Sequence, residues 1–247
     1  NELPRLAALL CPGREVVRVA TTLDLELTRE AALLLGRELS RAAAGGTSAL
    51  RDAAAVVLDN AGGQILAYLG SPELEPAGPP LDAARSANPS GSTLKPFLYA
   101  LALERGWTCA SLLPDLPLSF GGEESYRPEN FDRRSRGLVR LRSALAGSLN
   151  VPSVYLLFRL GLPEFLRTLS RLGLEPGPAG GVGLGAAVGN VPVSLLELTR
   201  AFSVFPRGGR LPALAAVRSL RTAEGREIPL RLPEGPRVFS RESAWLV

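Results

Sequence analysis

Apolar positions along this chain recur with two different spacings, which predict a mixture of helices and strands. Spacings of three and four residues predict helices at 25–44, 92–106, 141–147, 151–161, 163–173 and 193–205. Short apolar runs bounded by turn residues predict strands at 16–22, 53–58 and 64–69, and within 215–232. Ser240 is placed to cap a final helix. Strand pairs mixed with many helices, with no internal repeat, indicate an α+β fold.

Turn residues separate these segments. The Asp-Asn-Ala-Gly-Gly sequence at 59–63 joins two strands into a hairpin, and a second hairpin turns near Glu224 and Gly225. Stretches rich in Gly and Pro predict loops at 70–89, 112–136 and 177–189. The loop at 112–136 is long for a compact domain, and loops of that kind are often functional. The glycines of 181–185 resemble a phosphate loop only superficially, because no P-loop lysine or strand-to-helix fingerprint accompanies them.

The helix predicted at 92–106 has a sharply defined start. The Asn-Pro-Ser-Gly sequence at 88–91 is a turn, and Gly106 is a stop signal. Pro96 is tolerated only in the first turn, where backbone N–H groups have no partner inside the helix, so the helix is predicted to begin at about Ser92. Apolar residues on several sides of this helix predict that most of it is buried.

This helix carries the only lysine of the chain. Lys95 is one of 28 Lys and Arg residues, and all the others are Arg. An arginine cannot release its proton, whereas a desolvated lysine can become a neutral amine that acts as a base. Lys95 follows Ser92 by three residues, and positions three apart face the same way on a helix. Ser-x-x-Lys is the local signature of acyl-transferring enzymes in which a lysine activates a serine. The alternative, an isolated surface lysine, conflicts with the predicted burial.

The absence of histidine narrows the chemistry further. Without imidazole, a Ser-His-Asp triad, a Cys-His dyad and a His-bearing zinc site are excluded. We expect neither a metal nor a cofactor. Cys11 and Cys109 lie far apart without a Cys-x-x-Cys spacing, so free thiols and a disulfide both stay open.

A second candidate group is the Ser-Leu-Asn sequence at 148–150, between two predicted helices. The Ser148 hydroxyl can relay a proton to a leaving amine, and the Asn150 amide can bind a lysine and a substrate carbonyl together. A plain helix cap is an equally good interpretation of this triplet alone, and Ser86 with Asn88 has the same spacing.

Taken in order, these motifs resemble the transpeptidase domain of class A penicillin-binding proteins, most of all their 1C members. The resemblance rests on Gly-Ser-Thr-Leu-Lys-Pro-Phe at 91–97 and Ser-Leu-Asn-Val-Pro at 148–152. Residues 53–63, 112–115, 126–132 and 195–209 are also similar to that family, and 22–24 resembles the segment that follows its glycosyltransferase domain. The resemblance covers about 15–247. It implies a penicillin-binding, β-lactamase-like serine transpeptidase fold, in which helices pack on an antiparallel sheet.

The resemblance also implies roles for four residues. Ser92 is the nucleophile that attacks the penultimate D-Ala carbonyl of a peptidoglycan stem peptide, and Lys95 is its base. Ser148 passes a proton to the departing D-Ala, and Asn150 holds Lys95 and the substrate. A second stem peptide then accepts the acyl group, and β-lactams trap Ser92 as an acyl-enzyme. The implied location is the extracytoplasmic, periplasmic side of the bacterial inner membrane.

The chain departs from the family in one respect. The third motif, Lys-Thr-Gly or Lys-Ser-Gly on an inner strand, is missing because no lysine follows Lys95. We therefore expect a C-terminally truncated piece that is weak or inactive alone. Residues 1–48 are expected to be a strand and helix that follow an absent glycosyltransferase domain, and 49–247 an incomplete transpeptidase domain.

Other readings stay open at this point. A β-lactamase shares Ser-x-x-Lys but needs a deacylating Glu; a Ser-Lys amidase or esterase would ignore penicillin. A degenerate domain would bind cell-wall peptides or proteins without chemistry, and cell-wall synthesis proteins are further candidate partners.

Nucleic acid is not an expected partner, because the basic run at 133–142 lacks interleaved aromatic residues. No apolar run reaches the roughly 18 residues of a membrane span, so membrane attachment would need a preceding anchor.

Overall fold

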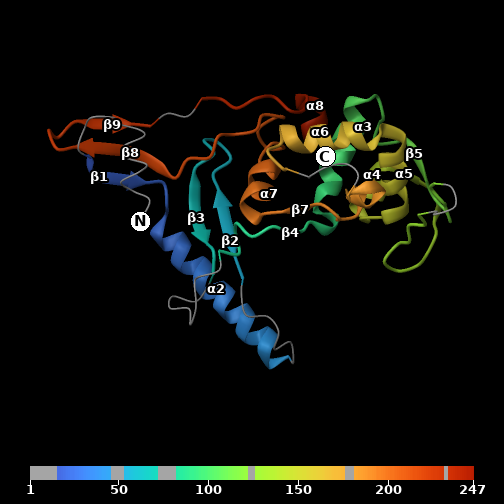
Figure 1. Cartoon of the computed structure of the whole chain (residues 1–247), viewed down its shortest axis with the longest axis horizontal. Coiled ribbons are helices and arrows are strands. Elements are labelled where there is room, and N and C mark those ends of the chain that lie inside the picture. The colour runs from blue at the N-terminus through green and yellow to red at the C-terminus, as the bar shows by residue number, and fades with distance from the viewer. Residues whose placement is uncertain (1–15, 46–52, 72–81, 122–125, 176–180, 231–232) are drawn as a thin grey trace. The chain divides into compact units, whose positions relative to one another are not determined.

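The chain folds into helices and short antiparallel strands, as the computed structural model shows (Figure 1). The structure describes residues 16–45, 53–71, 82–121, 126–175, 181–230 and 233–247. The strands are β1 (Val16–Thr21), β2 (Ala55–Leu58), β3 (Ile65–Leu69), β4 (Asn88–Pro89), β5 (Leu112–Asp115), β6 (Gly137–Arg140), β7 (Pro192–Val193), β8 (Val217–Thr222) and β9 (Glu227–Pro229). The helices are α2 (Leu25–Ala44), α3 (Lys95–Glu104), α4 (Leu141–Ala146), α5 (Asn150–Leu160), α6 (Leu162–Arg171), α7 (Leu195–Phe202) and α8 (Arg241–Leu246). Two 3₁₀ turns, η1 (Gly91–Leu94) and η3 (Gly183–Ala187), complete the described elements.

These elements form two compact units. The first contains residues 1–85 and 212–235, and the second contains 86–211 and 236–247. The first unit holds the three-stranded sheet β1-β8-β9, the hairpin β2-β3 and helix α2. Asp24 caps α2 because its carboxylate accepts the N–H groups of Glu26 and Leu27, both at 3.0 Å. No described residue of α2 is buried.

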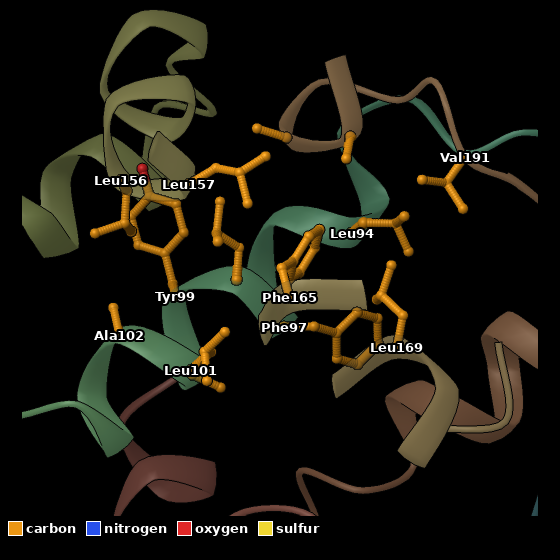
Figure 2. Packing of buried hydrophobic residues seen from close by; sticks show 14 of the residues in the cluster. Leu94, Phe97, Tyr99, Leu101, Ala102, Leu156, Leu157, Phe165, Leu169 and Val191 are labelled. Atoms are coloured by element: carbon orange, nitrogen blue, oxygen red, sulfur yellow. The ribbon is translucent and has the colours of Figure 1, made fainter. Parts of the chain in front are cut away.

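The second unit is built around helix α3. Seven of its ten residues are buried, including Phe97, Tyr99 and Leu101. Figure 2 shows Tyr99 pointing toward α5, where Leu156 and Leu157 lie, while Phe97 lies near Leu169 of α6. The Phe97 ring also packs on the rings of Phe202 and Phe205, at centroid distances of 5.0 and 5.4 Å. The other apolar members of this buried cluster include Leu94, Leu98, Leu113, Val154, Phe165, Leu172, Val191 and Phe239. Burial of apolar surface on all sides of α3 fixes the segment that carries Lys95.

Most predicted elements are confirmed with boundaries shifted by one to three residues. The α+β class, the two hairpins, α2 and the capped helix α8 all occur where the sequence predicted them. The helix predicted from Ser92 instead starts with the 3₁₀ turn η1, and α3 begins at Lys95 with Pro96 in its first turn. Proline at this position does not disrupt the helix, because a backbone nitrogen in the first turn has no hydrogen-bond acceptor within the helix.

The predicted loop at 112–136 is wrong at its start. Residues Leu112–Asp115 form β5, which pairs antiparallel with β6. Pro114 suggested a loop, but a strand in a two-stranded ribbon has one unpaired edge, so a residue without an N–H is tolerated there. The predicted loops at 70–89 and 177–189 fall partly outside the described residues. Their described parts include β4 and η3, and β4 pairs with β7.

Three further expectations concern membrane attachment, cysteines and domains. Among the described residues, no helix has both the length and the apolar character to cross a membrane. Cys109 is a free thiol, and Cys11 lies outside the described residues. The functional division at residues 48 and 49 stays a prediction.

Candidate active site

Lys95 is almost completely buried. It is the first residue of α3, and 1% of its surface is exposed. Burial lowers the pKa of Lys95 from 10.5 to about 8, because the charged ammonium loses its hydration. A lysine with this pKa is partly neutral near physiological pH, which a general base requires.

Three oxygen atoms surround the Lys95 amine. Its Nζ atom lies 2.6 Å from the carbonyl oxygen of Ser148, 3.2 Å from the Ser148 hydroxyl and 2.7 Å from Oδ1 of Asn150. The structure therefore brings together three of the four predicted site residues, although 53 and 55 residues separate Lys95 from Ser148 and Asn150. All three oxygens belong to neutral groups. They orient the amine, and none carries the negative charge of a carboxylate, which would stabilise the protonated lysine.

The turn between α4 and α5 presents these oxygens. Ser148 has a left-handed backbone, with φ at 50°, one of two described residues other than glycine with positive φ. The buried Leu149 anchors the turn, and its N–H donates to the carbonyl oxygen of Ala144 at 3.0 Å. A serine in this conformation is strained by about 1–2 kcal/mol, and strain of this kind concentrates at functional sites.

Ser92 lies on the turn just before Lys95. It belongs to η1 and is exposed, and its carbonyl oxygen accepts the backbone N–H of Lys95. Within the described part of the chain, the Ser92 hydroxyl makes no hydrogen bond, so none joins it to the lysine amine. Its role as the nucleophile stays a prediction, supported by its position on the turn that ends at the buried lysine.

The glycine-rich segment packs against the turn that carries Ser92. Gly189 has φ at 120°, and a Cβ atom there would lie 2.4 Å from the Cα atom of Gly91. A Cβ atom at Gly185 would similarly lie 2.1 Å from the Asn190 amide. Gly189 therefore allows close packing next to Ser92, and Gly185 allows close packing within its own segment; the sequence interpretation anticipated neither. Glycine enrichment was the only available signal, and it did not indicate which segment would pack against these glycines.

Sequence reasoning also missed Asn130 and Asp115. The Asn130 side chain contacts the first residues of α5 and the carboxylate of Asp115, which is fully buried. Both residues lie in the loop predicted at 112–136, within segments that also resemble the family. No periodicity or spacing could have joined them to Asn150.

Comparison with known proteins identifies the family. A family model described as "Penicillin binding protein transpeptidase domain" matches residues 53–247. The chain belongs to this transpeptidase family. Penicillin-binding protein 1B of Vibrio cholerae is 32% identical over 206 residues, covering 79% of this chain and 25% of that protein. Penicillin-binding protein 1C of Escherichia coli is 32% identical over 219 residues, covering 85% of this chain and 27% of that protein.

A solved structure agrees with the sequence relatives. Penicillin-binding protein 1A of Haemophilus influenzae superposes with a TM-score of 0.70 and 27% identity, over 78% of this chain and 33% of that one. The resemblance and the fold expected from the two motifs are thereby confirmed. The transpeptidase chain spans about a quarter of the length of the two curated relatives described above.

The basic run of this transpeptidase chain lies beside Asn130. Arg136 bonds to Asp132 at 2.6 Å and reaches Asp115 at 3.4 Å. Arg127, Arg133 and Arg134 line a hollow of about 310 Å³ together with Asn130. Part of the run is therefore structural, because Arg136 neutralises a buried carboxylate.

Proposed function

We propose that this chain is the catalytic part of a peptidoglycan D,D-transpeptidase, which cross-links stem peptides through an acyl-serine intermediate. The proposal is carried by one observation, the buried Lys95 amine held by oxygens of Ser148 and Asn150 and one turn from Ser92. Family membership supports the same reaction class. The chain's own activity, substrates and partners remain proposals because it spans only part of its relatives.

Acylation begins with proton transfer from the Ser92 hydroxyl to the neutral Lys95 amine. The Ser92 oxygen then forms a bond with the carbonyl carbon of the penultimate D-Ala, and the carbonyl oxygen becomes an oxyanion. The backbone N–H of Ser92 supplies one donor to this oxyanion. When the peptide C–N bond breaks, the leaving D-Ala amine takes the proton of Ser148, and Lys95 returns a proton to Ser148 over their 3.2 Å contact.

Deacylation runs through the same groups. The amine of a second stem peptide attacks the ester carbon and gives a proton to Ser148, which passes one to Lys95. When the ester C–O bond breaks, Lys95 returns that proton to the Ser92 oxygen. The products are a new peptide bond and the free serine. A β-lactam enters by the same first step, and its ring opens to leave an acyl group on Ser92.

We further propose that the reaction takes place on the extracytoplasmic, periplasmic side of the bacterial inner membrane, where peptidoglycan lies. Stem peptides and β-lactams are the proposed ligands. A segment with Lys-Thr-Gly would bind the substrate carboxylate and complete the oxyanion hole. No lysine follows Lys95, so we expect slow acylation by the 247-residue chain alone.

The test is the intact mass of the protein after incubation with a penicillin, with peptide mapping of any adduct. It is run on the 247-residue chain and on a chimera in which the segment following the aligned region of E. coli penicillin-binding protein 1C is joined after Val247. An adduct on Ser92 in the chimera supports the proposal, and its absence from the chain alone assigns the deficit to the added segment. Ser92→Ala is the matched control.

Two results would contradict the proposal. Absence of an adduct in both proteins, with folding verified, would favour a domain that binds cell-wall peptides without chemistry. Rapid release of hydrolysed penicillin would favour a β-lactamase-like hydrolase instead.

A further inference from the structure

The start of helix α5 is capped by a side chain from a distant loop. Leu149 occupies the N-cap position and has no side-chain acceptor. Oδ1 of Asn130 accepts the backbone N–H groups of Asn150 at 2.9 Å and Val151 at 3.3 Å. First-turn N–H groups have no partner within their own helix, so Asn130 satisfies two donors that would otherwise be left unpaired.

The direction of the Asn130 amide is fixed by its other contacts. Its Nδ2 atom donates to Oδ1 of Asp115 at 2.6 Å and to the carbonyl oxygen of Arg134 at 2.8 Å. Both partners are acceptors. A reversed amide would set its oxygen against two acceptors and its NH₂ against two donors, so only one orientation satisfies all four groups.

Asp115 is itself held in place. Its side chain is fully buried, and Oδ2 accepts the backbone N–H of Arg136 at 3.1 Å and faces the Arg136 guanidinium at 3.4 Å. Oδ2 of Asp115 therefore faces Arg136, whose positive charge neutralises the carboxylate, and Oδ1 accepts from the Asn130 amide. An ionised carboxylate can only accept, which makes it a reliable guide for the direction of a neighbouring amide.

Asn150 is then fixed through both its backbone and its side chain. Asn130 holds the backbone N–H, and the carbonyl oxygen of Glu129 accepts Nδ2 at 2.9 Å. Oδ1 of Asn150 is left to face Lys95 Nζ at 2.7 Å. Two adjacent loop residues therefore determine which atom of Asn150 the lysine meets.

We propose that Asn130, directed by Asp115, is a positioning residue for Lys95: it fixes the start of α5 and so holds the Ser148 and Asn150 oxygens against the lysine amine. The dependence of acylation on this contact rests on the proposed function, whereas the placement of Lys95 does not. Asn130 does not touch the amine; it acts through Asn150.

The surroundings of Lys95 explain why this placement matters. Burial alone accounts for its lowered pKa, with no contribution from a charged group. Of the charged groups on α3 and the helices packed against it, Glu104 bonds to Ser240, and Glu164 pairs with Arg105 and Arg167. The remaining ones are exposed: Arg142, Arg159, Arg171, Arg241 and Glu242. Asp115 is separated from Lys95 by two neutral amides. If the start of α5 moved, water would reach the amine and restore its proton.

Because Lys95 is the only lysine, the positioning role of Asn130 can be tested through the pKa of Lys95, without an activity assay. Protein grown with lysine labelled by ¹³C at Cε gives one lysine signal, and its chemical shift against pH reports the Lys95 pKa directly. We expect a pKa near 8 in the wild type and a rise of at least about one unit in Asn130→Leu, which has the same size but no amide. Asp115→Asn, which removes the acceptor-only partner, should shift the pKa in the same direction by less.

Ser194→Ala is the matched control. Ser194 caps α7 in the same unit by accepting the N–H of Glu197 at 3.2 Å, and no described contact joins it to Lys95. This variant loses a cap of the same kind, so it should lower stability while leaving the Lys95 pKa unchanged. Asn130→Ala carries the same expectation as Asn130→Leu and replaces it if the leucine variant does not fold.

The outcomes separate the two proposals. Folded Asn130 and Asp115 variants whose lysine titrates as in the wild type would overturn the positioning role, as would an equal shift in Ser194→Ala. The rate of penicillin adduct formation in the chimera should fall by about tenfold or more in Asn130→Leu, following the loss of base function. A wild-type chimera that forms no adduct would count against the proposed function, and the lysine titration would still decide the role of Asn130.

Discussion

The Nζ atom of Lys95 lies 2.6 Å from the carbonyl oxygen of Ser148, a residue whose backbone is left-handed. The contact joins the buried first turn of α3 to the strained turn between α4 and α5. It holds the amine with an oxygen that carries no net charge. Burial therefore sets the pKa of the lysine, and the Ser148 turn sets its position.

Replacing the lysine with a permanent cation should remove the chemistry. In Lys95→Arg we expect adduct formation with penicillin to fall by about 10²-fold or more, because a guanidinium keeps its proton. Mass spectrometry of the chimera checks the rate, and circular dichroism checks the fold. If the larger guanidinium disturbs α3, Lys95→Met gives an uncharged side chain of similar length with the same expectation. Adduct formation at the wild-type rate in either variant would refute the base assignment.

Acylation should depend on pH through Lys95. Its pKa is lowered to about 8, so the neutral amine becomes abundant as pH rises through that value. We expect the rate of adduct formation to increase about tenfold from about pH 6.5 to pH 7.5 and to level off above about pH 8.5. Stopped-time mass spectrometry in constant ionic strength measures the profile. A rate that stays flat over this range would show that another group accepts the serine proton.

Stability should also rise with pH in this range. Between about pH 8 and the ordinary lysine value of 10.5, the unfolded chain keeps the Lys95 proton that the folded chain has released. The unfolded state then binds more protons, so the free energy of unfolding increases with pH, by about 1–2 kcal/mol from about pH 8 to pH 9.5. Urea titration followed by fluorescence of Trp107 and Trp245, both in the second unit, measures it.

Lys95→Met is the control for this linkage, because it removes the titrating group. Its free energy of unfolding should be flat over the same range. The upper limit is set by Tyr99, whose pKa is raised to about 12 by burial, so that stability declines once the unfolded tyrosine ionises near pH 10. An equal rise in the wild type and in Lys95→Met would assign the effect to other groups.

Local signals predicted much of this fold from the sequence. The apolar spacing of 25–44, the turn at 59–63 and the Ser240 cap act over short stretches, and α2, the β2-β3 hairpin and α8 occur as predicted. Burial of Lys95 also followed from the apolar residues around α3. Such features depend on neighbours along the chain, and these can be read from the sequence directly.

Contacts between distant segments were beyond such reasoning. The β5 strand was missed because Pro114 disfavours a strand, and only its pairing with β6 makes one. Only the family resemblance predicted that Lys95 and Ser148 lie in one site. No sequence signal indicated the cap that Asn130 gives α5, and glycine enrichment alone did not indicate that Gly189 approaches Gly91, because each contact depends on where two distant backbones meet.

The approach of Gly189 to Gly91 predicts a sensitive position next to Ser92. In Gly189→Ala the new methyl group would meet the Gly91 backbone, so the η1 turn must shift. We expect at least about tenfold slower adduct formation, since small misplacement of a reacting group is costly. Gly181→Ala is the control, because nothing lies within 4 Å of its Cβ position and its φ is not positive. Equal rates in both variants would show that the turn tolerates the displacement.

The left-handed backbone of Ser148 predicts a conflict between stability and function. Ser148→Gly and Ser148→Ala both remove the hydroxyl that lies 3.2 Å from Lys95 Nζ, so adduct formation should be slowed about equally in both. Only glycine relieves the strain of φ at 50°. The glycine variant should therefore unfold with about 1 kcal/mol more free energy than the alanine variant, in urea titration followed by tryptophan fluorescence. If alanine proved as stable as glycine, the turn would not be strained. If the glycine variant kept the wild-type rate of adduct formation, the Ser148 hydroxyl would have no part in proton transfer.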